Sequence, residues 1–152
     1  MKSAKSFAAK PFKALLALSM LCIAAQASAQ TVVTDAWVRA TVPGQPSTGA
    51  FMTVTADTDS KLLGAQSPAA KTVQIHQSSM TNDVMSMKEV ASVELPAGKP
   101  VSMDSNSYHV MLIDLQKQVK EGDQVPISLT VEDAAGAKQT IEVQATARAL
   151  TA

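Results

Sequence analysis

The sequence predicts an all-β fold, an antiparallel β-sandwich. Two observations support this prediction. Short runs of β-branched and aliphatic residues, often alternating with polar ones, recur along the chain, and turn-forming Pro, Gly and Asp residues separate them. Short strands with frequent turns are typical of packed antiparallel sheets. We expect no helix of more than two turns after residue 29.

The N-terminal segment is predicted to lie outside this fold. Four lysines, with no acidic residue among them, precede an apolar run over residues 14–25 that is too short to span a bilayer. Ala27-Ser28-Ala29 follows as a small-x-small cleavage pattern. This order is typical of a secretory signal peptide. We therefore expect residues 1–29 to be removed and residues 30–152 to form one exported domain.

Cleavage after Ala29 would change the charge and the thiol content. Residues 30–152 hold nine basic against thirteen acidic side chains, a formal net charge of −4. That balance disfavours nucleic acid or an anionic membrane surface as partner. The only cysteine, Cys22, follows Leu21, whereas bacterial lipid-attachment signals need a small residue there. We interpret Cys22 as apolar filler, and expect no stable membrane anchor, no disulfide and no thiolate ligand.

The strands are predicted in order from their β-branched and aliphatic runs. They are residues 31–33, 51–55, 72–76, 108–112, 125–131 and 140–143. Turns are predicted at residues 43–44, 96–98, 121–123 and 135–136. The last turn joins the final two runs, which predicts a C-terminal hairpin.

The two histidines of the chain each have methionines nearby. His109 and Met111 are two residues apart on a predicted strand, so they project from the same face. His76 ends another predicted strand, and residues 78–83 form a plausible hairpin loop that leads to Met87. A third strand carrying His109 and Met111 could bring all four side chains to one end of the sandwich.

Two imidazoles and two thioethers are a soft, neutral set of donors. Such donors suit copper(I) above other metals, with silver(I) as its natural mimic. Zinc prefers thiolate, imidazole or carboxylate, and calcium and magnesium need oxygen ligands. His76, Met87, His109 and Met111 are therefore the candidate metal ligands.

Each of these residues alone also has a structural interpretation. A methionine in a strand is usually core filler, and a histidine beside an apolar run is usually a polar residue with satisfied hydrogen bonds. The joint pattern favours a site, since both histidines have methionine neighbours. Among the other residues, Met52 and Met103 are expected to pack, while Met80 and Met85 could be outer-shell or entry ligands. Trp37 is expected to anchor the core, with cover for the metal site as the alternative.

Catalytic motifs are poorly represented. No Gly-x-Ser-x-Gly elbow and no glycine-rich phosphate loop occur in the sequence. We therefore expect a protein that is not an enzyme.

The spacing of the four candidate ligands resembles the pattern of the periplasmic copper(I) chaperones called PCu(A)C proteins. That pattern is His, ten residues, Met, twenty-one residues, His, one residue, Met, and this chain matches every spacing. Residues 35–45, 48–52, 67–71, 96–98 and 109–112 extend the resemblance. The departures are Gln77, where a methionine is common, Ser107, where a glycine is common, and the lack of a His- and Met-rich tail for copper(II).

The resemblance implies a cupredoxin-like, or immunoglobulin-like, sandwich that carries copper(I) in the periplasm. It also implies delivery to the dinuclear copper centre of cytochrome c oxidase, often beside Sco-type thiol proteins. Two alternatives stay open: a copper-scavenging resistance protein without a specific recipient, and a non-metal immunoglobulin-like interaction module.

Overall fold

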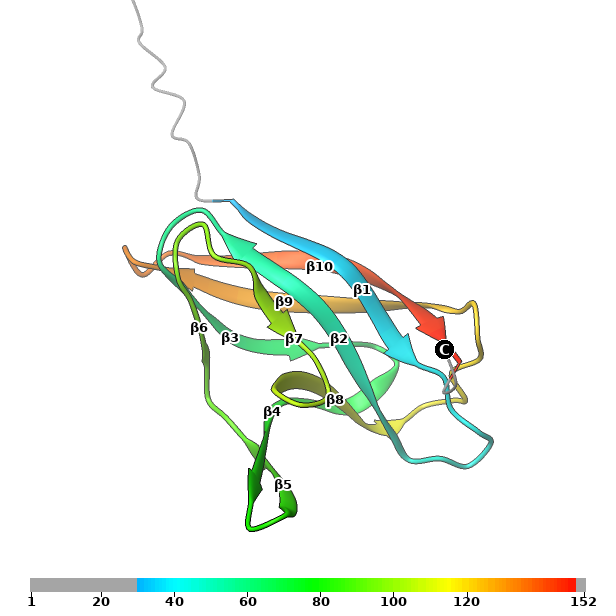
Figure 1. The fold of residues 1–152 in the computed structure, drawn as a ribbon. Coiled ribbons are helices and arrows are strands. Elements are labelled where there is room, and N and C mark those ends of the chain that lie inside the picture. The colour runs from blue at the N-terminus through cyan, green and yellow to red at the C-terminus, as the bar shows by residue number, and fades with distance from the viewer. Residues whose placement is uncertain (1–29, 150–152) are drawn as a thin grey trace, which may run out of the picture.

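The computed structural model describes residues 30–149, which form ten β-strands and no helix (Figure 1). The strands are β1 (Thr31–Arg39), β2 (Ser47–Ala56), β3 (Ser60–Gln66), β4 (Ala70–Thr81), β5 (Val84–Glu89), β6 (Val93–Leu95), β7 (Val101–Met103), β8 (Tyr108–Leu115), β9 (Gln124–Asp133) and β10 (Lys138–Arg148). The all-β prediction is thereby confirmed. The predicted signal peptide, with Cys22, lies outside the described residues. Over residues 30–149, no helix of the length and apolarity needed to cross a membrane is found.

The strands join into one continuous sheet that folds over on itself. Hydrogen bonding follows the order β5-β4-β8-β2-β1-β10-β9-β3-β6, and β7 adds to β2. Strands β3, β9 and β10 lie behind β1 and β2 in Figure 1, which gives the two layers of a sandwich. The pairs are antiparallel except for β1 and β10, which run parallel. That parallel pair departs from the predicted, purely antiparallel arrangement.

The core fills the space between the layers. Alternate residues of β2, β4 and β8, such as Val54, Ile75 and Leu112, are buried in it, in one cluster with Ile127 and Leu129 of the other layer. Met52 and Met103 are buried in the same cluster, so their expected packing role is confirmed. The other faces of β2, β4 and β8 lie outside the core.

Both predicted hairpins are present, but the loop of one differs from the prediction. Strands β9 and β10 pair along their length across residues 134–137, which confirms the C-terminal hairpin. Strands β4 and β5 pair from His76–Glu89 out to Thr81–Val84, and they project from the sandwich in Figure 1. Only Asn82 and Asp83 form the turn, with φ of 50° and 62°. Positive φ at both positions is what a type I′ turn requires, so the loop is shorter than predicted.

A β-bulge in β1 places Trp37 on the outer side of the sheet. Val33 pairs with Val54 and packs against the core, but the register shifts by one between Thr34 and Trp37, where Asp35 has a φ of 51°. The extra residue reverses the inward and outward alternation. Trp37 therefore pairs with Phe51 outside the core cluster, so its predicted role as core anchor is wrong.

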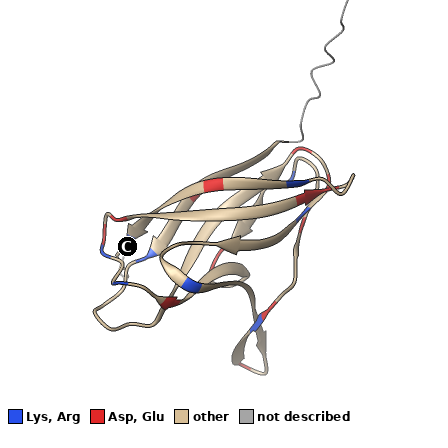
Figure 2. Cartoon of the chain, turned by 180° about the vertical axis from the view of Figure 1, so that it is seen from behind, with Lys and Arg blue, Asp and Glu red and all other residues tan. Residues whose placement is uncertain are grey.

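Charged residues of both signs are interspersed over the described strands (Figure 2). Within the part of the chain that the structure describes, two ion pairs are formed, Lys61 with Glu94 and Arg148 with Asp35, both on the surface. Exposed pairs of this kind contribute little to stability, at most about 1 kcal/mol each. The second pair lies at the bulge in β1.

Candidate metal centre

The four predicted ligands lie on one face of three adjacent strands, β5, β4 and β8. His76 pairs directly with His109, and Met111 follows two residues along β8. Ser78 lies two residues beyond His76 on β4 and pairs with Met87 of β5. Because residues paired across strands share a face, and so do residues two apart, all four side chains project from the same side. That side is opposite the core, since Ile75 and Val110 between them point inward.

The two histidines are direct neighbours. Their ring centroids lie 6.0 Å apart with an interplanar angle of 66°. His109 is only 3% exposed, whereas His76 is partly exposed. Burial lowers the pKa of His109 below its usual value of 6.5, and the positive charges of His76 and Arg39 act in the same direction. The Ser107 carbonyl and Asp104 oppose this shift. The buried imidazole is thus favoured in its neutral form, the form that can bind a metal.

Each imidazole has a hydrogen-bonding partner at one nitrogen. Nε2 of His76 lies 2.8 Å from Oε1 of Gln74, and Nδ1 of His109 lies 3.4 Å from the Ser107 carbonyl oxygen. An N–H donated to each oxygen leaves Nδ1 of His76 and Nε2 of His109 with a free lone pair. Such partners select the tautomer and orient the ring of a metal-binding histidine.

Two aromatic rings cover the buried end of this face. Phe51 lies 6.2 Å from the His109 ring and 4.7 Å from Trp37, between centroids. Arg39 stacks on Phe51 and Arg148 on Trp37, each with the guanidinium carbon 5.4 Å from the ring centroid. Trp37 contacts Phe51, and Phe51 contacts His109, so Trp37 reaches the site only through Phe51. Its alternative role, cover for the metal site, stays a prediction.

Gly49 provides the space for the Phe51 ring. A Cβ atom at residue 49 would lie 2.9 Å from Cζ of Phe51, closer than side chains tolerate. Gly49 also pairs with Met111, so the ring passes over the strand beside the candidate ligand. A small residue at this position therefore allows Phe51 to reach the His109 neighbourhood.

The methionines differ in burial. Met111 is partly buried, but Met87 is 56% exposed. Met80 and Met85 are also exposed and pair with each other near the hairpin turn. The candidate site thus has a covered end at His109 and an open end at Met87.

Several contributors to this face were missed in the sequence. Gln74 lies two residues before His76, so strand alternation could have indicated it. The Ser107 carbonyl is likewise two residues before His109. Phe51 and Gly49 reach the His109 neighbourhood only through the pairing of β2 with β8, and no local pattern signals that. Within residues 30–149, no three His, Cys, Asp or Glu side chains are grouped to hold a metal ion.

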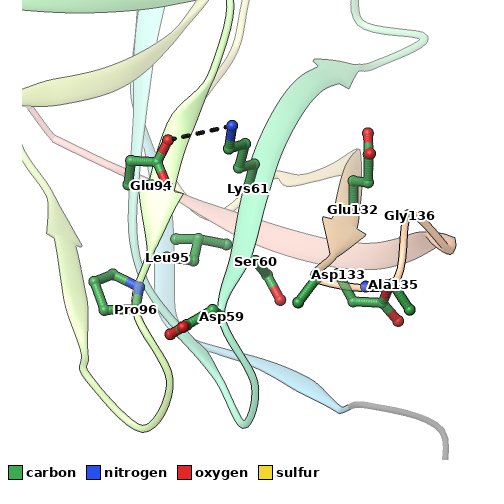
Figure 3. Close-up of a pocket in the computed structure, with 11 residues that line it drawn as sticks. Asp59, Ser60, Lys61, Glu94, Leu95, Pro96, Glu132, Asp133, Ala135 and Gly136 are labelled. Atoms are coloured by element: carbon green, nitrogen blue, oxygen red, sulfur yellow. Dashed lines mark hydrogen bonds and ion pairs between the residues drawn. The ribbon is translucent and has the colours of Figure 1, made fainter.

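An open pocket of about 590 Å³ lies elsewhere, on β3, β6, β9 and the turn after β9 (Figure 3). It shares no strand with the His and Met residues. Four of its eleven lining residues are acidic, and its Lys61 pairs with Glu94. The pocket therefore adds nothing to the candidate metal centre.

Comparison with known proteins agrees with this description. Residues 31–145 match the family described as "Putative lipoprotein LpqE-like". The chain belongs to this LpqE-like family. It is also 27% identical over 139 residues to the "Putative lipoprotein Lxx21020" of Leifsonia xyli subsp. xyli, covering 86% of this chain and 84% of that protein.

Solved structures share the fold over most of both chains. The solution structure of copper(I)-bound DR1885 from Deinococcus radiodurans is 32% identical, covers 82% of this chain and 83% of that one, and has a TM-score of 0.59. The apo PCuAC domain of PmoF2 is 26% identical, covers 80% and 92%, and has a TM-score of 0.61. The apo PCuAC domain of PmoF1 shares the fold at 21% identity over 78% and 93%, with a TM-score of 0.64. The resemblance to the PCu(A)C family is confirmed.

Proposed function

We propose that the chain binds one copper(I) ion through His76, Met87, His109 and Met111 and carries it as cargo to a recipient protein. The observation that supports this most is the strand register, which aligns His76 with His109 and puts both methionines on their face. Two similar structures are described as copper-bound, the PCuAC domain of PmoF2 and DR1885 with copper(I). A metal carrier needs no catalytic group.

The donor chemistry suits this cargo. Thioether sulfur and neutral imidazole are soft or borderline ligands, and they add no negative charge to a monovalent ion. The covered His109 holds its ring in place, while the exposed Met87 leaves one side open to a partner. A site with one open side can exchange its ion with a second protein by replacing ligands one at a time.

Copper(I) stoichiometry, measured by competition with a chromophoric chelator, tests the binding. We expect one tightly held ion per chain, and we expect copper(I) and silver(I) to compete successfully with excess zinc. Met103→Leu is a matched control, because Met103 is buried in the core and its sulfur should not be needed. Zinc binding as tight as copper(I) binding would contradict the assignment.

For the recipient, we propose the copper centre of cytochrome c oxidase or a Sco-type thiol protein. Mixing the copper(I)-bound protein with an apo-oxidase copper subunit, and separating the two, would show whether the ion moves. Transfer faster than release to buffer supports delivery. Tight binding without such transfer would instead favour a copper-scavenging role.

We also propose that the protein is exported to the periplasm after cleavage behind Ala29. The lipoprotein names of the family and of the Leifsonia protein agree with an exported chain. Mass spectrometry of the protein from a periplasmic fraction should give an N-terminus at Gln30. A lipid-modified N-terminus at Cys22 in the membrane fraction would contradict the predicted cleavage site.

A further inference from the structure

Three methionines are exposed on the same face of the β4–β5 hairpin. Met80, Met85 and Met87 are 64%, 51% and 56% exposed. Met80 lies two residues beyond Ser78, and Ser78 pairs with Met87, so all three share the face of His76 and His109. The opposite face carries Ser79 and Ser86, whose hydroxyl oxygens lie 2.9 Å apart. Thioethers are thus gathered on one side of a projecting hairpin.

Met80 and Met85 are directly opposed. In a two-residue hairpin the pair beside the turn, here Thr81 and Val84, is hydrogen-bonded, so the next pair is the closer, non-hydrogen-bonded one. Side chains of such a pair start from Cα atoms about 4.5 Å apart. Two flexible thioethers attached there can direct both sulfurs to one point. The hydrogen-bonded serines on the other face and the tight turn hold this register.

We propose that Met80 and Met85 form a second, weaker site for copper(I), from which the ion passes inward through Met87. Two neutral thioethers can hold a soft monovalent cation with two-fold coordination, and they discriminate against zinc and calcium. Met85 and Met87 are two apart on β5 and share a face, so an ion can exchange one sulfur for the next. Binding at Met80 and Met85 stands by itself, while the inward passage rests on the proposed function.

Silver(I) titration of the full exported chain, labelled with ¹³C at the methionine methyl groups, tests the site. The first equivalent should shift the methyl signals of Met87 and Met111. A second equivalent, bound at least about tenfold more weakly, should shift those of Met80 and Met85. The buried Met52 and Met103 are internal controls whose signals should stay in place. Unmoved Met80 and Met85 signals above two equivalents would overturn the proposal.

The double variant Met80→Leu/Met85→Leu separates sulfur chemistry from apolar surface. Leucine keeps the size and the apolarity, so a face that serves only for apolar docking would be unchanged. We expect the variant to keep the first equivalent of silver(I) and to lose the second. A second equivalent that persists with unchanged affinity would overturn the assignment.

A His76→Ala/His109→Ala variant distinguishes this inference from the proposed function. If the outer site is real, the Met80 and Met85 signals still respond to silver(I) in this variant, even if the inner site proves not to exist. The inward route has its own readout in stopped-flow uptake of copper(I) from a chelator. The double leucine variant should take up copper(I) several-fold more slowly than the parent, with unchanged equilibrium affinity at the first site. An equal uptake rate would overturn the inward route.

Discussion

The two ends of the candidate site differ in how they are held. His109 lies on a central strand, 3% exposed, with Phe51 against its ring and the Ser107 carbonyl near Nδ1. Met87 lies on β5, an edge strand whose six residues are all exposed. The His109 end is held by strands on both sides, since β8 lies between β4 and β2. The Met87 end is held only by the hydrogen bonds between β5 and β4.

This difference separates holding an ion from exchanging it. Ligands locked by packing and by neighbouring hydrogen bonds keep their geometry without the metal, so they lose little entropy on binding. An exposed methionine on an edge hairpin keeps its rotamer freedom and can leave the ion at low cost. We therefore expect substitutions at the covered end to change affinity most, and those at the open end to change exchange rates most.

The largest effect is expected from His109→Ala. Removing a ligand should cost more than the roughly 10–100-fold lost when an outer-shell partner is mutated, so copper(I) affinity should fall by more than about 100-fold. Met87→Ala should cost less, roughly tenfold, because an exposed thioether is only partly desolvated by binding. Chelator competition measures both. If Met87→Ala weakens binding as much as His109→Ala, the two ends are equivalent and the comparison fails.

Stability should show a different ranking. Met52 is buried in the core, so Met52→Ala should lower the free energy of unfolding by about 2–5 kcal/mol while leaving the ligands in place. Met87→Ala should change it by no more than about 0.5 kcal/mol, as is usual for exposed sites. Met111→Ala should weaken copper(I) binding and keep the fold. Urea unfolding of the metal-free proteins is the measurement. A Met111→Ala protein that unfolds but keeps its affinity would show that Met111 is structural.

Gly49→Ala should act on the covered end indirectly. The added methyl group would lie 2.9 Å from Phe51 Cζ, so the ring must move away from its present contacts. Overpacking of this kind costs about 1–3 kcal/mol. We expect a loss of stability together with a several-fold loss of copper(I) affinity. Gly64→Ala is the matched control, since no atom lies within 4 Å of a Cβ there. A destabilised Gly49→Ala protein with parental affinity would show that Phe51 does not position His109.

The smallest effect is expected from pH. A histidine must be neutral to bind copper(I), and burial lowers the pKa of His109 below 6.5, so the neutral form persists to lower pH than in an ordinary histidine. Affinity should therefore fall as the pH drops through the acidic range, and only shallowly, because at most two protons compete. It should become flat in a His76→Met/His109→Met variant. Affinity measured between pH 5 and 8 that does not change in the parent protein would exclude histidine ligands.

The fold class and the pairs of neighbouring ligand residues could be predicted from the sequence, because strand alternation is a local property. His109 and Met111 share a face whatever the rest of the chain does. The side on which a strand packs is not local, and Trp37 shows this. The bulge between Thr34 and Trp37 adds one residue to β1, and the Trp37 side chain therefore points to the opposite face of the sheet. Nothing in the surrounding sequence marks this bulge. In the same way, Phe51 and Gly49 belong to the surroundings of His109 only because β2 pairs with β8, and that pairing is not visible in the local sequence.

The position of Trp37 has a practical consequence. It is the only tryptophan in the chain, and its ring is stacked on Phe51, which in turn lies against His109. An indole at this distance lies outside the predicted ligand set but within the same packed column of rings. Its fluorescence is therefore a built-in optical signal for events at the covered end of the face, one that needs no added dye and leaves every proposed ligand untouched.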